Sequence, residues 1–181
     1  LAEFVPHGPA LTYFATAPMM HGAAMWATLI SLLAGHTVVV NDQPSFDAEH
    51  VWDIVVRDGV NILSVVGDAM ALPLIRALEI QPGRWNLQHL RTFGNGGAVF
   101  SKHLQERLKA LLPHISINNS MGSSEAGLVG GKERPPGSDG MLQMEPRPDL
   151  AVIDDELCIV TAPGSEGTLA PQTWARLQIT A

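Results

Sequence analysis

Residues 23–40 read AAMWATLISLLAGHTVVV, and this stretch sets the expected fold class. Met25, Leu29 and Leu32 recur at helical spacing, and a glycine three residues later supplies a stop signal. Residues 37–40 are all β-branched, which favours a strand. A helix followed directly by a strand is therefore the expected unit.

The same helix-to-strand pattern repeats downstream. Ser45 and Asp47 both offer capping chemistry for a second helix, which leads into the apolar strand expected at residues 62–66. A third helix is expected after Gly67, and Ser101 is expected to cap a fourth. Further strands are expected at residues 90–93 and 115–118. Helices that alternate with strands are typical of crossover connections, so we predict an α/β fold with a layered, mostly parallel sheet flanked by helices.

The composition changes in the last third of the chain. Residues 130–137 read GGKERPPG, which is too rich in glycine, proline and charge to continue a helix or a central strand, so we expect a loop there. Two extended segments, residues 150–153 and 157–160, are expected to pair as a hairpin. We therefore divide the chain into a central α/β part, residues 1–130, and a loop with a short β-rich segment, residues 131–181.

Composition and charge exclude several classes of protein. The 181 residues are 46% hydrophobic and 16% charged, as in a globular protein with one main domain. The net charge of −7 lacks the basic excess that nucleic-acid binding requires. The apolar run at residues 23–33 is about half of the ~20 residues that span a bilayer, so we expect no integral membrane segment. The lone Cys158 cannot form an internal disulfide, which fits a cytoplasmic protein.

One motif combines the groups that a phosphate and its metal ion need. Residues 119–127 read NSMGSSEAG and follow the last strand expected in the sheet. Glycine lets backbone N–H groups approach an anion, Ser123 and Ser124 can donate to phosphate oxygens, and Glu125 offers the hard oxygen ligand that Mg²⁺ prefers. The competing interpretation is a polar loop whose hydroxyls cap a neighbouring helix.

Two other spots lie at the ends of predicted elements. Residues 94–99, GNGGAV, place Val99 where the dinucleotide fingerprint requires a small residue, so a tight turn with positive φ competes with a binding loop. His21 stands just before an apolar helix, where it could hold a carboxylate or phosphate, although a simple helix-entry histidine is the alternative. The sequence has neither the HExxH pair of a zinc enzyme nor a nucleophile elbow.

The order of the motifs resembles a known family. The chain has PMMHGAAMW at 18–26, LAGHTVVV at 33–40, VGDAM at 66–70, GGA at 96–98 and MGSSEAG at 121–127. Together these motifs resemble the adenylate-forming (AMP-binding) acyl-CoA synthetases, and they are most similar to the actinobacterial fatty-acid or steroid-side-chain CoA ligases. The resemblance covers roughly residues 10–130, and a weaker similarity continues to about residue 160. It implies the central part of an adenylation-domain fold.

The resemblance implies a two-step reaction. A carboxylate attacks the α-phosphate of ATP to give acyl-AMP and pyrophosphate, and the CoA thiol then displaces AMP. The expected partners are therefore a fatty or other carboxylic acid, ATP with Mg²⁺, and CoA as cosubstrate, with a second copy of the chain in a homodimer as a further candidate.

The resemblance also implies roles for individual residues. Ser123 and Ser124 would contact the AMP phosphate, Glu125 would ligate Mg²⁺, and His21 would face the acyl carboxylate or α-phosphate. His21, Ser124 and Glu125 are the implied catalytic residues. The rest of the nucleotide site would comprise Gly96, Gly97, Ala98, Ser120, Met121 and Gly122. The apolar acyl tunnel would be formed around Trp26, Val66, Gly67 and Met70.

The chain also departs from the family pattern. Met121 stands where family members usually place an aromatic residue that stacks on adenine. The family's phosphate loop would precede residue 1, and its Thr-Gly-Asp ribose clamp and C-terminal catalytic lysine would follow the chain. We therefore expect a fragment of an acyl-CoA ligase that is inactive alone. The alternatives are a non-catalytic remnant that binds acyl groups or nucleotides, and an enzyme that adenylates an aryl or amino acid in a shorter pocket.

Overall fold

A computed structural model describes residues 8–123, 127–133, 150–153 and 168–171. The chain divides into two compact units, Leu1–Gln143 and Met144–Ala181. Within the described residues, no helix has both the length and the apolar character needed to cross a bilayer.

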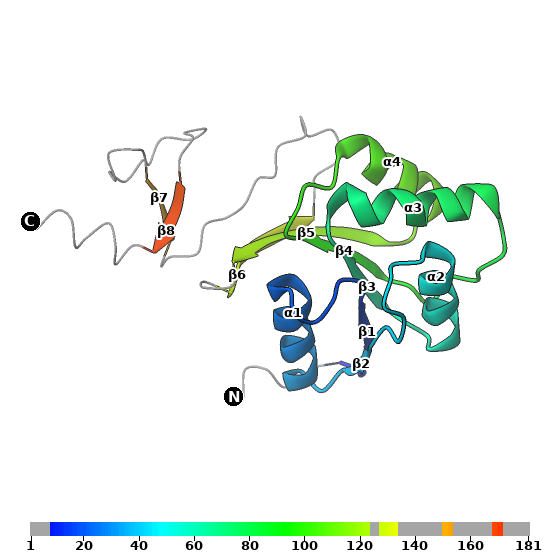
Figure 1. Ribbon diagram of the computed structural model, residues 1–181, viewed down its shortest axis with the longest axis horizontal. Coiled ribbons are helices and arrows are strands. Elements are labelled where there is room, and N and C mark those ends of the chain that lie inside the picture. Colours follow the sequence, from blue (N-terminus) through cyan, green and yellow to red (C-terminus); the bar gives the residue numbers. More distant parts are fainter. Residues whose placement is uncertain (1–7, 124–126, 134–149, 154–167, 172–181) are drawn as a thin grey trace, which may run out of the picture. The chain divides into compact units, whose positions relative to one another are not determined.

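The first unit is built on a six-stranded sheet with the order β2-β1-β3-β4-β5-β6 (Figure 1). Its strands are β1 Thr12–Ala15, β2 Thr37–Val39, β3 Ile62–Val65, β4 Thr92–Gly96, β5 Ser116–Ser123 and β6 Gly127–Glu133. The helices are α1 Gly22–Leu33, α2 Ala48–Arg57, α3 Gly67–Ile80 and α4 Lys102–Leu111. Strands β1 to β5 run parallel, and only β6 runs antiparallel to its neighbour. The predicted α/β class with a mostly parallel sheet is confirmed.

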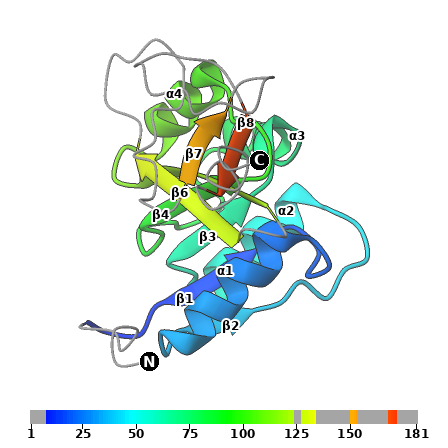
Figure 2. The ribbon, with the colours of Figure 1, turned by 90° about the vertical axis from the view of Figure 1, so that its left-hand side faces the viewer.

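The path of the chain explains why the helices are divided between two faces. The chain passes from β1 to β2 at one edge of the sheet, then returns across β1 to β3 and continues to β4 and β5. Crossovers between parallel strands are right-handed, so this reversal places α1 on the face opposite α2, α3 and α4. Figure 2 looks onto α1, which lies across β1 and β2. Ligands of open α/β sheets bind beyond the carboxyl ends of the strands at such a reversal, here between β1 and β3.

The face under α2, α3 and α4 holds the main hydrophobic core. Large apolar side chains from successive strands are buried there, namely Phe14, Leu63, Val65, Phe93 and Ile117. Trp52 of α2 is fully buried, and its indole N–H donates to the carbonyl of Leu74 at 3.0 Å. The indole donor is thus satisfied inside an otherwise apolar layer, as a buried tryptophan requires.

The face under α1 is built from smaller side chains. A second cluster contains the buried residues Tyr13, Ala15, Ala17 and Ala24. The buried side chains of α1 itself are Ala24, Thr28 and Ser31. By contrast, Leu29 and Leu32, which supplied the helical spacing in the sequence, are 43% and 54% exposed. The helix was predicted correctly, but its small residues rather than its leucines pack on the sheet.

Several element boundaries differ from the sequence prediction. β1 was not anticipated at all, although it contains the strand-favouring Thr12, Tyr13 and Phe14. β4 continues through Gly94 and Gly96, which were expected to form a turn, and among these glycines only Gly97 beyond the strand has a positive φ, 82°. The loop expected from residue 130 is wrong for residues 130–133, which belong to β6. Antiparallel pairing with β5 at the sheet edge supports this glycine-rich strand.

The two capping predictions had different outcomes. Asp47 caps α2 as predicted, because its Oδ1 accepts from the backbone N–H groups of Glu49 and His50 at 2.9 and 3.1 Å. Ser101 occupies the N-cap of α4, but its side chain makes no capping bond, and its buried hydroxyl has no partner among the described residues. Instead its backbone N–H donates to Asp68 Oδ1 at 2.7 Å, which ties the starts of α3 and α4 together.

The second unit contains a two-stranded antiparallel sheet of β7, Leu150–Ile153, and β8, Thr168–Pro171. The sequence predicted β7 but missed β8, which pairs with it. Residues 157–160, the partner that the sequence suggested for β7, lie outside the described residues.

Two glycines with nearly the same backbone conformation provide a test of the packing around the β3–α3 turn. Gly59 and Gly67 have φ values of 63° and 61°. A Cβ at Gly59 would meet nothing within 4 Å, whereas a Cβ at Gly67 would lie 2.7 Å from Ala98 Cβ and 2.9 Å from the Val99 carbonyl oxygen.

We predict that Gly59→Ala lowers the free energy of unfolding by about 1 kcal/mol, through backbone strain alone. Gly67→Ala is expected to cost about 3 kcal/mol, because overpacking against Ala98 and Val99 adds to the same strain. Urea denaturation of both variants measures the difference. Equal losses of unfolding free energy in the two variants would show that Ala98 and Val99 can move aside at no energetic cost.

Candidate functional site

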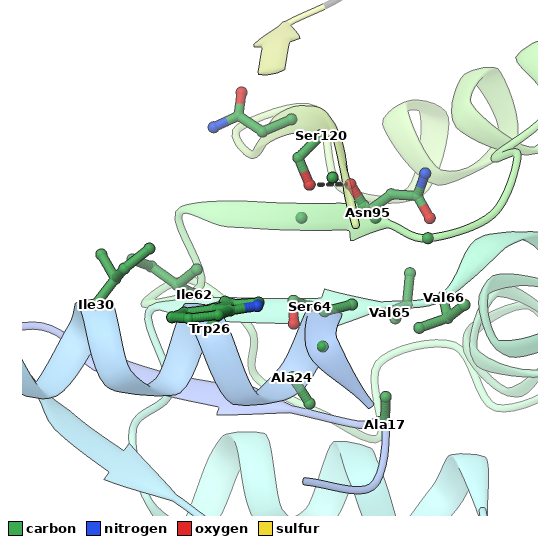
Figure 3. A pocket seen from close by; sticks show the side chains of 18 of the residues that line it. Ala17, Ala24, Trp26, Ile30, Ile62, Ser64, Val65, Val66, Asn95 and Ser120 are labelled. Atoms are coloured by element: carbon green, nitrogen blue, oxygen red, sulfur yellow. Dashed lines mark hydrogen bonds between the residues drawn. The ribbon is translucent and has the colours of Figure 1, made fainter. Parts of the chain in front are cut away.

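A cavity of about 550 Å³ lies between α1 and the sheet (Figure 3). Its α1 wall consists of Gly22, Ala23, Ala24, Trp26, Ala27, Ile30 and Ser31. Its sheet wall is formed from four parallel strands and the residues that follow them, namely Tyr13, Ala17, Ile62, Ser64, Val65, Val66, Thr92, Gly94, Asn95, Gly96, Gly97, Asn118, Ser120, Met121 and Gly122. The volume is within the range of small-molecule sites, and most of the lining groups are small or apolar.

The cavity exists because β4 presents glycine where a strand normally presents a side chain. Gly94 pairs with Ser64 of β3 and Asn118 of β5, and Gly96 pairs with Ser120 of β5. Alternate residues of a strand share one face, so Gly94 and Gly96 open the same face toward α1. Glycine inside a strand marks a place where a ligand or another backbone approaches closely.

The carboxyl ends of β4 and β5 form one end of the cavity. A Cβ at Gly96 would lie 2.7 Å from Ser120 Oγ, which donates to the Asn95 carbonyl at 2.9 Å. Gly97 follows with a positive φ and is exposed, so the backbone turns away from the strand without a side chain over the cavity. A ligand can therefore contact the backbone directly at this end.

Asn95 holds this end of the cavity in place. Its Oδ1 accepts from the Gly67 backbone N–H at 2.7 Å, and its Nδ2 donates to the Ala98 carbonyl at 3.0 Å and to Asn119 Oδ1 at 3.2 Å. Both asparagines are 5% exposed. Asn119 Nδ2 in turn donates to Gln105 Oε1 of α4 at 3.4 Å. One buried amide network therefore joins the β3–α3 turn, the end of β4, β5 and α4.

A second polar group lies further along the same wall, toward the amino ends of the strands. The hydroxyls of Tyr13 and Ser64 are 2.7 Å apart and form a hydrogen bond. Burial raises the pKa of Tyr13, and the hydrogen bond to Ser64 lowers it by a smaller amount. The phenol is thus a neutral hydrogen-bonding group at physiological pH.

The structure brings together seven of the residues that the sequence singled out. The cavity is lined by Trp26, Val66, Gly96, Gly97, Ser120, Met121 and Gly122. Met121 is 40% exposed. The motifs at residues 18–26, 96–98 and 121–127, which lie far apart in the sequence, thus contribute to a single cavity.

Other predicted residues lie beside the cavity rather than on its wall. Gly67 is buried against Ala98, whose carbonyl accepts from Asn95. Met70 packs partly buried against both hydrophobic clusters, and its sulfur accepts from the Thr16 hydroxyl at 3.2 Å. Gly67, Met70 and Ala98 therefore support neighbouring residues of the wall.

His21 lies at the entry to α1. It is the N-cap residue, and its carbonyl accepts from the backbone N–H groups of Ala24 and Met25 at 3.0 and 2.9 Å. Its side chain is exposed, makes no capping bond and is not part of the cavity wall. The exposed imidazole is available to a ligand that enters beside Gly22.

The phosphate and metal motif is only partly within the described residues. Ser123 is the last residue of β5, and Ser124 and Glu125 lie outside the described residues. Within the part of the chain that the structure describes, no three histidine, cysteine or acidic residues are grouped to hold a metal ion.

Sequence reasoning missed several residues of the site. Tyr13, Ser64 and Thr92 line the cavity but belong to no motif that the sequence analysis named, and Asn95 belongs to the GNGGAV segment but was given no role there. The available signal is the period-two pattern of β3 and β4, in which small or polar residues alternate with Leu63, Val65 and Phe93. Such alternation indicates one core face and one open face.

Comparison with known proteins gives consistent results. Residues 2–171 match the family model described as AMP-binding enzyme. The chain is 34% identical over 163 residues to the medium-chain acyl-CoA ligase Mig of Mycobacterium avium, an alignment that covers 88% of this chain and 29% of the relative. It is 38% identical over 130 residues to the medium/long-chain-fatty-acid–CoA/3-oxocholest-4-en-26-oate–CoA ligase of Mycobacterium tuberculosis, covering 72% of this chain and 23% of the relative. The chain thus spans less than a third of the length of these relatives.

The fold has also been observed in solved structures. A long-chain-fatty-acid–CoA ligase from Archaeoglobus fulgidus superposes with a TM-score of 0.67 at 22% identity, covering 87% of this chain and 33% of that protein. At this identity the similarity shows the fold alone.

Asn95 offers a test of the network that holds the cavity end. We expect Asn95→Ala to lower the free energy of unfolding by about 2–3 kcal/mol, because it leaves the Gly67 N–H and the Ala98 carbonyl without their partner. Asn86 is the matched control, since it is exposed and its side chain accepts a local bond from the Gln88 N–H. Asn86→Ala should change the same quantity, measured by urea denaturation, by less than about 0.5 kcal/mol. Equal effects of the two variants would contradict the role given to Asn95.

Proposed function

This chain belongs to the AMP-binding enzyme family, and we propose that it is part of an ATP-dependent acyl-CoA ligase that activates fatty acids. The observation that carries this proposal is the cavity, which runs under α1 from the glycine-rich ends of β4 and β5 along an apolar wall. An acid to be activated needs such a channel with its carboxylate end near a phosphate-binding motif. The relatives named above, both acyl-CoA ligases, support the same assignment.

The proposed reaction has two steps. The carboxylate of the acid attacks the α-phosphate of ATP, which releases pyrophosphate and leaves acyl-AMP. The thiol of CoA then attacks the acyl carbon, which releases AMP and leaves acyl-CoA. The protein contributes mainly by holding the reacting groups in position and by stabilising the charge on the phosphate.

The carboxyl ends of β4 and β5 suit the nucleotide. Gly96 and Gly97 expose backbone beside Ser120 and Gly122, and a side chain at Gly96 would collide with Ser120. We assign the AMP moiety to this end, with Met121 packing on adenine through its flexible thioether. Ser123 and Ser124 would then donate to the α-phosphate.

We assign the catalytic residues to the same end. Glu125 would hold Mg²⁺, whose charge offsets that of the phosphates. His21 at the start of α1 would donate to the carboxylate or the α-phosphate. The positive end of the α1 dipole favours an anion at the same place.

The cavity also supports a long acyl chain over a compact aryl acid. Trp26 and Ile30 of α1 and Ile62 and Val66 of the sheet side all line the cavity, and its volume of about 550 Å³ exceeds the need of a single ring. We therefore assign the apolar part of the cavity to the acyl tail and the enzyme to fatty-acid metabolism.

Use of ATP and CoA supports a cytoplasmic location for the enzyme. Sedimentation analysis would decide whether the enzyme is a homodimer.

The first prediction from this proposal concerns the isolated chain. Because it matches less than a third of its relatives, we expect it to lack groups needed for adenylation, and to show no ATP–pyrophosphate exchange with fatty acids. The longer protein that contains it should show exchange that depends on the fatty acid. ATP–pyrophosphate exchange by the isolated chain would refute the proposal that adenylation needs the remainder of the longer protein. Absence of exchange by the longer protein would refute the ligase assignment.

The second prediction concerns Glu125. In the longer protein, Glu125→Ala should lower the rate of adenylation by roughly 100-fold or more, because the metal that offsets phosphate charge loses a ligand. The unfolding midpoint should stay unchanged. Glu106→Ala, which removes an exposed glutamate from α4, serves as the control and should leave both quantities unchanged. Wild-type turnover in the Glu125 variant would show that this carboxylate is no metal ligand.

A further inference from the structure

A pair of hydroxyls on the cavity wall has no role in the reaction proposed above. Tyr13 lies on β1 and Ser64 on β3, the two strands between which the sheet order reverses. Their hydroxyl oxygens are 2.7 Å apart, and both residues line the cavity. Tyr13 is only 4% exposed. A buried polar pair in an otherwise apolar part of a ligand site calls for an explanation.

The two hydroxyls carry two hydrogens, and only one of these takes part in the hydrogen bond within the pair. Each hydroxyl carries one hydrogen, and the single bond between them uses one of the two, whichever group donates. Among the described residues, neither hydroxyl has a second hydrogen-bonding partner. One O–H donor is therefore left for whatever fills the cavity. A ligand that displaces water from this donor without replacing the hydrogen bond loses affinity.

Both residues of the pair line the cavity, and several residues around them are small. Gly94 stands beside Ser64 in the next strand and has no side chain, whereas a Cβ there would contact Ser64 Cβ at 3.4 Å. On the helix side, Ala24 and Ala27 line the same cavity. Figure 3 shows Ser64 between the sheet and α1, with Trp26, which also lines the cavity, drawn beside it.

The position of the pair identifies the part of a ligand that would meet it. Ser64 is level with Gly94, two residues before Gly96, which corresponds to roughly 7 Å along the strand. The cavity continues past the pair to Ile62, Thr92 and Ile30. An acid whose carboxylate lies at the Gly96 end would therefore pass the pair partway along its chain.

We propose that the Tyr13–Ser64 pair selects carboxylic acids that carry a hydrogen-bond-accepting oxygen, an oxo or hydroxyl group, partway along an otherwise apolar chain. The inference rests on the proposed acyl-CoA ligase function. It assigns a substrate class to the same site. Tyr13 and Ser64 touch the chain of the substrate and no reacting atom, so they determine specificity and take no part in the chemistry.

The test compares acids of equal length with the longer protein that contains this chain. The substrates are decanoic acid and oxodecanoic acids whose carbonyl is moved stepwise from the middle of the chain toward its end. We expect one carbonyl position to raise kcat/KM roughly tenfold over decanoic acid, since a site with a buried donor discriminates against ligands that lack its acceptor. Equal kcat/KM for decanoic acid and every oxo acid overturns the inference. Failure to release AMP with any acid instead refutes the proposed ligase function, and the inference with it.

Variants test whether the hydroxyls are the cause. In the double variant Tyr13→Phe with Ser64→Ala, the ratio of kcat/KM for the favoured oxo acid to that for decanoic acid should fall to about one. Thr28→Val is the matched control, because it removes a buried hydroxyl of α1 that contacts Met19 and lies outside the cavity wall. This control should keep the wild-type ratio. A preference that survives in the double variant overturns the assignment.

Binding to the wild-type protein gives a second measurement that needs no variant. Isothermal titration should show the favoured oxo acid binding roughly tenfold more tightly than decanoic acid. Equal affinities for the two acids overturn the inference, whether or not the double variant folds.

Discussion

The buried amide of Asn95 is the interaction on which the site depends. It is bonded to the backbone at Gly67 and at Ala98 and to the side chain of Asn119, so it fixes two turns and a neighbouring strand with one group. Removing a buried partner leaves its donors and acceptors unsatisfied, which costs more than the net value of the bonds themselves. The close contact of Gly67 with Ala98 and the course of the chain through Gly97 both lie next to this amide.

The two faces of the sheet differ in packing, since one holds the main core and the other holds the candidate site. Under α2, α3 and α4, large apolar side chains such as Phe14 and Phe93 form a dense core that tolerates little change. Under α1, glycines on β4 and alanines on the helix leave space, and α1 turns part of its apolar surface away from the sheet. The small side chains on this face leave the space that forms the cavity.

The predictions from sequence that were correct rest on local signals. Helical spacing, the β-branched strand after α1 and the Asp47 cap are local signals, and they located α1, β2 and α2. Local glycine content misled the prediction at β4 and β6, because pairing with neighbouring strands holds glycines extended. The leucines of α1 led to a different error, which concerned the side of the helix that packs on the sheet. Their spacing identifies a helix, but the side that meets the sheet depends on where the crossover places the helix.

The sequence by itself determined the helices and most strands of this protein, the α/β class and the family to which its motifs belong. These properties follow from periodicity and from short motifs whose chemistry does not depend on distant residues. Only the tertiary structure brought residues from the motifs at 18–26, 96–98 and 121–127 to one cavity, and placed Tyr13 of β1 beside Ser64 of β3. The reason is physical: strand order and register decide which side chains meet across a parallel sheet, and both are set by the packing of the whole unit.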